Sequence, residues 1–296
     1  MEPFGARLSG LVAARESQVV IGLDPDPAAL WPGSWEGIDS GGPAAKAAAA
    51  VSAHCRSVIA EAGPAAVAVK LQLACFERLG AGGWDALTAA TVAAQEAGLL
   101  VIADGKRADI DVSAVAYAQA LAGSVPTPEG EVAGLGVDAM TVAPYMGPDT
   151  IAPFVEAGTV AGAGVFVLVR TSNPGAAVIE DATLADGRPV WEAVAAMVAE
   201  ISGPPGAGGL ADVGAVVGAT APAQLQRARE LLPRTPFLLP GVGAQGGAVA
   251  DLAPAFVPGR AGGLVTASRS IVGSGPDGAR RAAEELREQA WSLPHG

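Results

Sequence analysis

Eight short apolar runs recur along the chain, at residues 19–23, 67–71, 99–104, 137–142, 164–169, 213–217, 236–239 and 263–266. They are rich in β-branched side chains, and apolar and polar residues do not alternate within them. Unbroken apolar runs of this length are typical of parallel strands that are covered on both faces. The pattern therefore predicts eight buried parallel strands.

Ala-rich helical stretches separate these runs, the clearest at residues 44–62, 74–97, 112–121, 221–231 and 277–291, and a further helix is expected at the N-terminus. Eight strand–helix units in 296 residues predict an α/β fold, a (β/α)8 TIM barrel that forms a single domain over residues 1–296. Periodicity alone leaves a doubly wound open sheet as the alternative. Two long connections, 122–136 and 171–189, are predicted to be loops, and long loops of this kind often carry binding residues.

Composition and charge narrow the class of protein. The net charge of −12 argues against a nucleic-acid partner, so an anionic ligand would need local donors. No apolar run has the length and flanks of a membrane span, and the N-terminus lacks the basic start and apolar stretch of a signal peptide. Cys55 and Cys75 form no close-spaced pair, and we expect two free thiols in a cytoplasmic protein.

Charged residues are scarce but gather where the predicted strands end, which is where barrel enzymes place their chemistry. Asp24 and Lys70 follow the first two strands, and the third strand ends in Asp104, Lys106 and Asp109. Only three lysines occur beside fifteen arginines, so a lysine at such a place suggests a task that needs a removable proton. Interleaved ammonium and carboxylate groups keep one another ionised despite burial. A surface salt-bridge cluster is the alternative interpretation.

A phosphate site is predicted from the loops after the last two strands. The stretch PGVGAQGG (240–247) includes Gly243 and Gln245, and Arg269 follows the eighth strand. Glycine lets the backbone approach a phosphate closely, and arginine makes paired contacts to it. A Gly-rich stretch taken alone is more often only a tight turn. Asp24 fits either a turn cap beside Pro25 or an acceptor for sugar hydroxyls, and Ser172 ends the fifth strand.

The stretch Asp104-Gly-Lys106-Arg-Ala-Asp109-Ile110 resembles the D-x-K-x-x-D-I motif of the orotidine 5′-phosphate decarboxylases. The segments GLDPDP, TSNPGA, PGVGAQGG and SRSI and the strand carrying Lys70 fall in the same order as in that family, so the resemblance covers nearly the whole chain. The length of this chain and its Lys106-Arg107 pair resemble those of the longer bacterial subgroup of that family. The resemblance implies decarboxylation of orotidine 5′-monophosphate to UMP, the last step of de novo UMP synthesis, without a metal or cofactor.

The resemblance also implies a role for each residue. Lys106 would protonate the ring carbon, Asp104 would lie near the departing carboxylate, Lys70 would bridge the ribose and the charge network, and Asp109 would reach into the partner's site of a homodimer. The implied substrate-binding residues are Asp24, Ser172, Gln245, Arg269, Gly243, Ser113 and Ile110. Ala108 and Asp111 stand where this subgroup commonly has Gly, and Ser113 where it has Thr, which puts the contacts across the dimer interface in question.

Two other functions compete with this one. A Mg²⁺-dependent sugar-phosphate decarboxylase or aldolase of the same superfamily would, by its family pattern, carry an acidic metal ligand where Lys70 stands. No group of His, Cys and Asp has metal-ligand spacing in this chain. A catalytically silent phosphate-binding barrel is the second alternative, and it would have no need for the intact set of two lysines and two aspartates.

Overall fold

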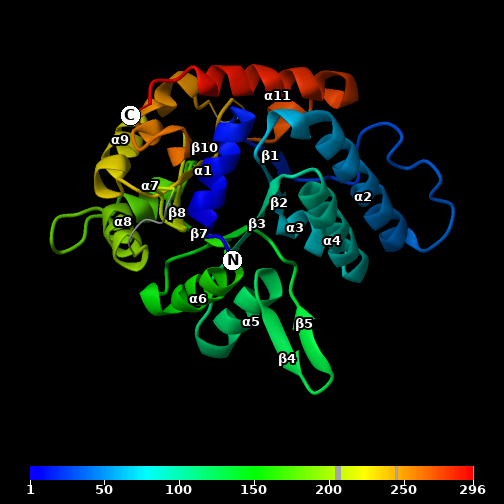
Figure 1. The fold of residues 1–296 in the computed structure, drawn as a ribbon, viewed down its shortest axis with the longest axis horizontal. Coiled ribbons are helices and arrows are strands. Elements are labelled where there is room, and N and C mark those ends of the chain that lie inside the picture. Colours follow the sequence, from blue (N-terminus) through cyan, green and yellow to red (C-terminus); the bar gives the residue numbers. More distant parts are fainter. Residues whose placement is uncertain (204–207, 244–245, 296) are drawn as a thin grey trace.

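In the computed structural model, which describes residues 1–203, 208–243 and 246–295, eight parallel strands close into a barrel (Figure 1). The strands are neighbours in the order β1, β10, β9, β8, β7, β6, β3 and β2, and β2 pairs with β1 to complete the ring. Their bounds are β1 (Val19–Leu23), β2 (Ala68–Gln72), β3 (Leu100–Arg107), β6 (Ala139–Val142), β7 (Gly164–Arg170), β8 (Val213–Val217), β9 (Phe237–Leu239) and β10 (Gly263–Ala267). All eight predicted strands are confirmed, and the open sheet is excluded.

Helices surround the barrel and follow its strands in turn (Figure 1). The longer ones are α2 (Pro43–Ala62), α4 (Ala81–Glu96), α5 (Asp111–Leu121), α6 (Ala152–Ala161), α8 (Val190–Ile201), α9 (Pro222–Leu231) and α11 (Gly275–Trp291). None of the described helices is long and apolar enough to cross a membrane. The buried faces of the helices and the outward side chains of the strands form one continuous apolar core.

The expected N-terminal helix, α1 (Phe4–Arg15), covers one end of the barrel. Figure 1 shows it lying across the middle of the ring. Its residues Phe4, Leu8 and Val12 pack with the inward side chains of the strands, and the rings of Phe4 and Phe166 meet edge to face. Because α1 closes the end at which the strands begin, the end at which they finish is left for a site.

Three predicted segments differ from the structure. The single helix expected at 74–97 is divided into α3 (Leu73–Glu77) and α4, because Gly80 has a positive φ of 67°. Gly83 allows the tight corner that follows, since a Cβ there would lie 1.9 Å from the carbonyl oxygen of Phe76. The predicted loop 171–189 contains the short helix α7 (Ala176–Glu180).

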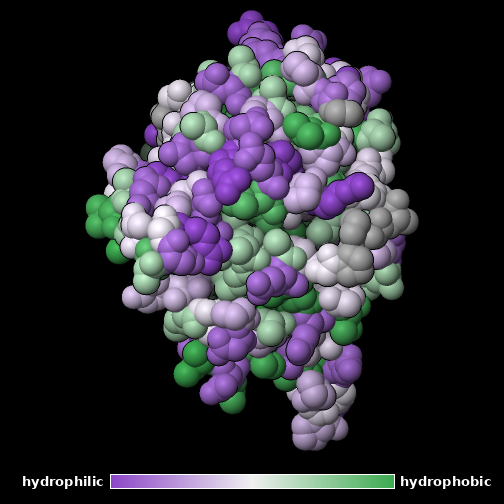
Figure 2. All heavy atoms as spheres, turned by 90° about the vertical axis from the view of Figure 1, so that its left-hand side faces the viewer, coloured by the Kyte–Doolittle hydropathy of each residue, from purple (hydrophilic) through white to green (hydrophobic). Residues whose placement is uncertain are grey.

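The third difference is a β-hairpin within the predicted loop 122–136. Strands β4 (Ser124–Thr127) and β5 (Gly130–Ala133) pair antiparallel. The hairpin projects from the body at the foot of Figure 1, and forms the protruding lobe at the foot of Figure 2. Three of the four residues of β4 and all four of β5 are exposed, so no apolar alternation marked it in the sequence.

Candidate active site

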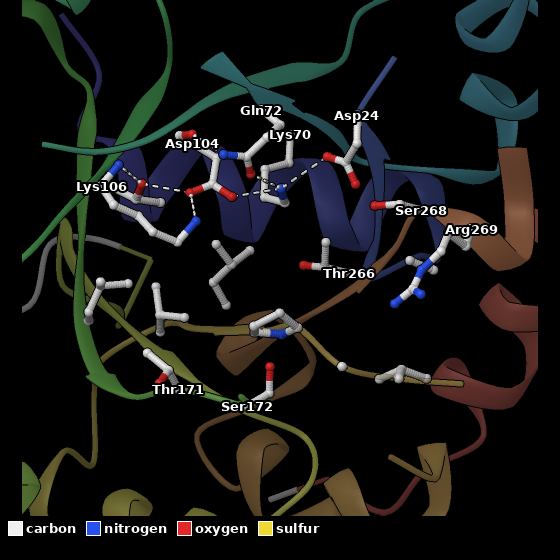
Figure 3. A pocket seen from close by; sticks show the side chains of 18 of the residues that line it. Asp24, Lys70, Gln72, Asp104, Lys106, Thr171, Ser172, Thr266, Ser268 and Arg269 are labelled. Carbon is white, nitrogen blue, oxygen red and sulfur yellow. Dashed lines mark hydrogen bonds and ion pairs between the residues drawn. The ribbon is translucent and has the colours of Figure 1, made fainter. Parts of the chain in front are cut away.

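A cavity of about 270 Å³ opens at the end of the barrel opposite α1. Figure 3 shows the side chains that line it. Inward-facing residues of the strands form its floor, and residues that follow the strands form its rim. The lining residues are Asp24, Lys70, Gln72, Asp104, Lys106, Thr141, Leu168, Thr171, Ser172, Val216, Leu238, Pro240, Gly241, Val242, Thr266, Ala267, Ser268, Arg269 and Ser270.

A chain of alternating charges crosses one wall of this pocket (Figure 3). The Asp104 carboxylate lies between two ammonium groups, with Oδ2 2.7 Å from Lys70 Nζ and Oδ1 2.7 Å from Lys106 Nζ. Lys70 Nζ also lies 3.7 Å from Asp24 Oδ1. The side chains of Lys70 and Asp104 are only 9% and 7% exposed, whereas that of Lys106 is 44% exposed. Lys70 and Asp104 therefore form a buried ion pair, and the accessible ammonium group of Lys106 binds to the same carboxylate.

The paired charges set the protonation states of the buried groups. Burial by itself raises the pKa of Asp104, but the ammonium groups of Lys70 and Lys106 outweigh that effect and lower this pKa to about 2. Burial likewise acts to lower the pKa of Lys70, yet the carboxylates of Asp104 and Asp24 raise this pKa above its ordinary value. Both groups are thus ionised at neutral pH, and the site holds a fixed negative charge beside two cations.

The backbone at Lys106 is held in an unusual conformation. Its φ is 45°, one of three positive values among the described non-glycine residues, and the pairing of β3 with β6 shifts register between Ala103 and Arg107. Thr141 fixes this turn, because its Oγ1 accepts a hydrogen bond from Lys106 N (2.9 Å) and donates one to Asp104 Oδ1 (2.8 Å). Left-handed backbone at a non-glycine residue is strained, and such strain is concentrated at functional sites.

An apolar wall faces the charged one. Leu168, Val216 and Leu238, near the ends of β7, β8 and β9, and Pro240, which follows β9, line the opposite side of the pocket. Ser172 lies on this side of the pocket, across from the charged row (Figure 3). A flat molecule in the pocket would have the Lys106 ammonium group on one side and apolar side chains on the other.

Arg269 forms the far end of the pocket, apart from the Lys106 end (Figure 3). Ser268 and Ser270 stand beside it, and Gly241 brings the backbone after β9 to the same rim with a φ of 103°. Gly22 on β1 makes room for Ser268, since a Cβ at Gly22 would lie 1.8 Å from Ser268 Oγ. A cation, two hydroxyls and a glycine backbone together suit an anionic group such as a phosphate.

The sequence matches the orotidine 5′-phosphate decarboxylase / HUMPS family over residues 17–286. This chain belongs to that family. It is 40% identical over 273 residues to the orotidine 5′-phosphate decarboxylase of Rhodopirellula baltica, covering 92% of this chain and 89% of that protein. It also resembles the solved structure of Leishmania donovani OMP decarboxylase, with a TM-score of 0.74, 32% identity, and coverage of 97% of this chain and 98% of that one. In Leishmania donovani UMP synthase (TM-score 0.77, 33% identity) the match covers 99% of this chain and 57% of the longer chain.

Within the family's fold, most of the expected site residues come together. The pocket contains Asp24, Lys70, Asp104, Lys106, Ser172 and Arg269. Gly243 lies in the turn after β9 with a φ of 69° but does not line the pocket, and Gln245 lies outside the described residues. The roles of these residues stay predictions.

Three other expected residues lie outside the pocket of their own chain. Asp109 is half-buried, with its Oδ1 accepting a hydrogen bond from the following backbone N–H, and Ile110 and Ser113 are exposed around the start of α5. None of the three lines the pocket of its own chain. The expectation that Asp109 serves a partner's site is compatible with this placement and is taken up below.

Several uncharged residues of the pocket, Gln72, Thr141 and Thr266 among them, were not among the expected site residues. Gln72 Nε2 donates to the carbonyl oxygen of Asp104 at 3.1 Å, which ties the ends of β2 and β3 together. The period of two that places Lys70 inward also places Gln72 inward, so this residue could have been found from the strand pattern. Thr266 and Ser268 are likewise two residues apart at the end of β10, so the same period indicates Thr266.

The segment that carries Ser172 is fastened by a cluster of ions that sequence reasoning missed. Arg170 makes two hydrogen bonds of 3.1 Å to the Asp181 carboxylate and one of 2.9 Å to Glu180 Oε2. Glu180 in turn accepts hydrogen bonds from the backbone N–H and the hydroxyl of Thr171. The chain around Ser172 is therefore anchored to the end of β7 by α7 and the residue that follows it, and is not a free loop.

Proposed function

We propose that this protein decarboxylates orotidine 5′-monophosphate to UMP and CO2, the last step of de novo UMP synthesis. The observation that carries the proposal is the Asp104 carboxylate held at 2.7 Å from both Lys70 and Lys106 in one pocket with Arg269. Membership of the family and the names of its relatives support the same reaction.

In the proposed mechanism Lys106 is the proton donor. The bond between the ring carbon and the carboxylate carbon breaks, its electron pair stays on the ring carbon, and CO2 leaves. Lys106 Nζ then transfers a proton to that carbon and is recharged from solvent, to which its side chain is 44% exposed. An ammonium group already in place stabilises the developing carbanion without reorganisation, which is the main way such a site accelerates the step.

The rest of the pocket would orient the nucleotide. Arg269 is suited to the phosphate, Asp24 and Lys70 to the ribose hydroxyls, and Ser172 to the pyrimidine. Binding energy from the phosphate, which lies away from the reacting carbon, can be used to hold the ring against Lys106.

We also propose that the protein is a homodimer in which Asp109 completes the site of the partner. Loops after the neighbouring strands β3 and β6 meet here, with Ala143 N donating to the carbonyl oxygen of Arg107 at 2.9 Å. These loops and the start of α5 expose large apolar side chains at Ile110, Val112, Tyr145 and Met146. An apolar surface of this kind beside a functional site is typical of a protein–protein interface.

Mixing inactive variants tests the shared site. Lys106→Ala and Asp109→Ala homodimers should each lack activity, and subunit exchange between them should restore part of it. One site of the mixed dimer then combines an intact Lys106 with an intact Asp109 from the other chain. A monomeric protein in sedimentation, or no recovery after demonstrated subunit exchange, would refute the shared site.

The reaction itself is tested by ultraviolet absorbance. Orotidine 5′-monophosphate incubated with the purified protein and excess EDTA should convert steadily to the UMP spectrum. Lys106→Ala should abolish this change while the protein stays folded and still binds UMP. Substantial residual decarboxylation by Lys106→Ala would refute the proton-donor role.

The second candidate is the Mg²⁺-dependent sugar-phosphate decarboxylase or aldolase considered in the sequence analysis. The position of Lys70 argues against this candidate, since its ammonium group occupies the space between Asp24 and Asp104 that a divalent cation would need. If the EDTA assay shows no turnover with a folded protein, Mg²⁺ with hexulose or gulonate phosphates is the next assay, and activity there would replace the proposed function. Binding of UMP without turnover in any assay would indicate a silent phosphate-binding barrel.

A further inference from the structure

The floor of the pocket contains a hydroxyl that no described residue of the fold pairs with. Thr266 lies on β10, is 5% exposed and lines the pocket. Its Oγ1 has no hydrogen-bond partner among the residues that the structure describes. Buried side-chain hydroxyls are nearly always paired, because an unpaired one has lost its water without replacement. The position is therefore suited to a hydrogen-bonding group that arrives with a ligand.

The surroundings of Thr266 indicate which part of a ligand would reach it. Figure 3 shows its side chain between the row formed by Lys70 and Asp24 and the side chain of Arg269. Its Oγ1 is itself buried in this rotamer. On β1, which separates β10 from β2, Thr266 pairs with Val20, whereas Lys70 pairs with Gly22 two residues further along, so Thr266 lies one inward-facing layer below Lys70. Thr266 thus lies at the floor of the pocket, beneath the space between the predicted ribose and phosphate contacts.

We propose that the Thr266 hydroxyl hydrogen-bonds to the sugar–phosphate half of the bound nucleotide, which makes Thr266 a substrate-binding residue. This inference rests on the nucleotide function proposed above. A threonine hydroxyl both donates and accepts, so it matches either a ribose hydroxyl or a phosphate oxygen. Rotation about its Cα–Cβ bond turns the oxygen toward the ligand without any movement of the backbone.

The test uses Thr266→Val, which removes the hydroxyl and keeps the shape of the side chain, and Thr266→Ser, which keeps the hydroxyl. Binding of UMP is measured by titration calorimetry, and the Tm is measured without ligand. The matched control is Thr91→Val in α4, remote from the pocket, where an equally buried Oγ1 donates to the carbonyl oxygen of Leu87 at 3.0 Å.

The two hydroxyls should respond in opposite ways. Thr266→Val should weaken UMP binding about 5–10-fold, the effect of one neutral hydrogen bond, and leave the ligand-free Tm unchanged or raised, since an unpaired buried hydroxyl has been removed. Thr266→Ser should bind UMP within about twofold of wild type. Thr91→Val should lower the Tm and leave UMP binding unchanged, because its hydroxyl is paired within the fold.

Two results would overturn the inference without touching the proposed function. One is unchanged UMP binding by Thr266→Val, and the other is a fall in its ligand-free Tm as large as that of Thr91→Val, which would place a partner for the hydroxyl within the fold. If the wild-type protein itself does not bind UMP, the proposed nucleotide function fails, and the assignment of Thr266 fails with it.

Discussion

Asp104→Asn should strongly destabilise the folded protein, although it changes a single functional group. The fall in the pKa of Asp104 from 3.8 to about 2 corresponds to about 2 kcal/mol in favour of the folded state at pH 7. The variant also leaves the buried Lys70 with Asp24, 3.7 Å away, as its charged partner and a 3.5 Å hydrogen bond to Gln72 Oε1. Removing one partner of a buried ion pair costs roughly 3–5 kcal/mol. We therefore expect a loss of about 2–5 kcal/mol in the free energy of unfolding.

The chain offers a close control for this prediction. Lys106 Nζ lies at the same 2.7 Å from Asp104 as Lys70 Nζ, but its side chain is 44% exposed against 9%. Because an exposed pair is screened by solvent, Lys106→Met should cost less than about 1 kcal/mol. The double variant Asp104→Asn/Lys70→Met should recover most of the loss caused by Asp104→Asn, since the uncompensated ammonium group is gone.

Urea unfolding followed by circular dichroism at pH 7 measures these differences, and one protein concentration is used throughout in case subunit association contributes. A free energy of unfolding for Asp104→Asn equal to that of wild type would refute the reasoning. The reasoning would also be refuted if Lys106→Met lowered the free energy of unfolding as much as Asp104→Asn does. In that case the stabilisation by an ion pair would not depend on its burial.

Three further predictions follow from the same contacts. The difference in free energy of unfolding between wild type and Asp104→Asn should shrink as the pH falls from about 4 to about 2. The reason is that Asp104, with its lowered pKa, stabilises the fold only while its carboxylate is ionised. A constant difference in acid unfolding curves would contradict this. Arg269→Ala should weaken UMP binding about 10–100-fold and leave uridine binding unchanged in calorimetry, and equal losses would refute the phosphate assignment. Arg170→Lys, which loses the paired contact to Asp181, should speed amide hydrogen exchange at Thr171, and unchanged exchange would show that the ion cluster does not anchor this segment.

The strands and the strand-end charges could be predicted from the sequence because both depend on local patterns. Strands buried on both faces leave unbroken apolar runs, and the closed parallel barrel brings the ends of those runs to one rim. Asp24, Lys70 and Asp104 therefore fell into one pocket as expected, although they are far apart in the chain.

What the sequence did not reveal depends on contacts that no local pattern records. The ion cluster of Arg170, Glu180 and Asp181 forms only after the chain has turned back from β7 through α7. The left-handed backbone of Lys106 is held by Thr141 from the neighbouring strand, whereas an extended strand end was expected. The exposed hairpin, with prolines at positions 126 and 128, lacks the alternation by which a strand is recognised.

The unequal burial of the two lysines also bears on the proposed mechanism. A lysine that donates its proton becomes neutral, and any carboxylate that depends on it then loses its counter-ion. Asp104 is protected from that loss, because Lys70 stays at 2.7 Å and is almost completely buried. Lys106, at the same distance but open to solvent, can give up its proton and regain one without leaving a buried charge unpaired. If Lys70 were the donor instead, the loss of its proton would leave Asp104 paired only with the ammonium group of Lys106, whose charge is screened by solvent. The energetics of the pair therefore support the proposal that Lys106 rather than Lys70 is the donor, in agreement with the resemblance to the family.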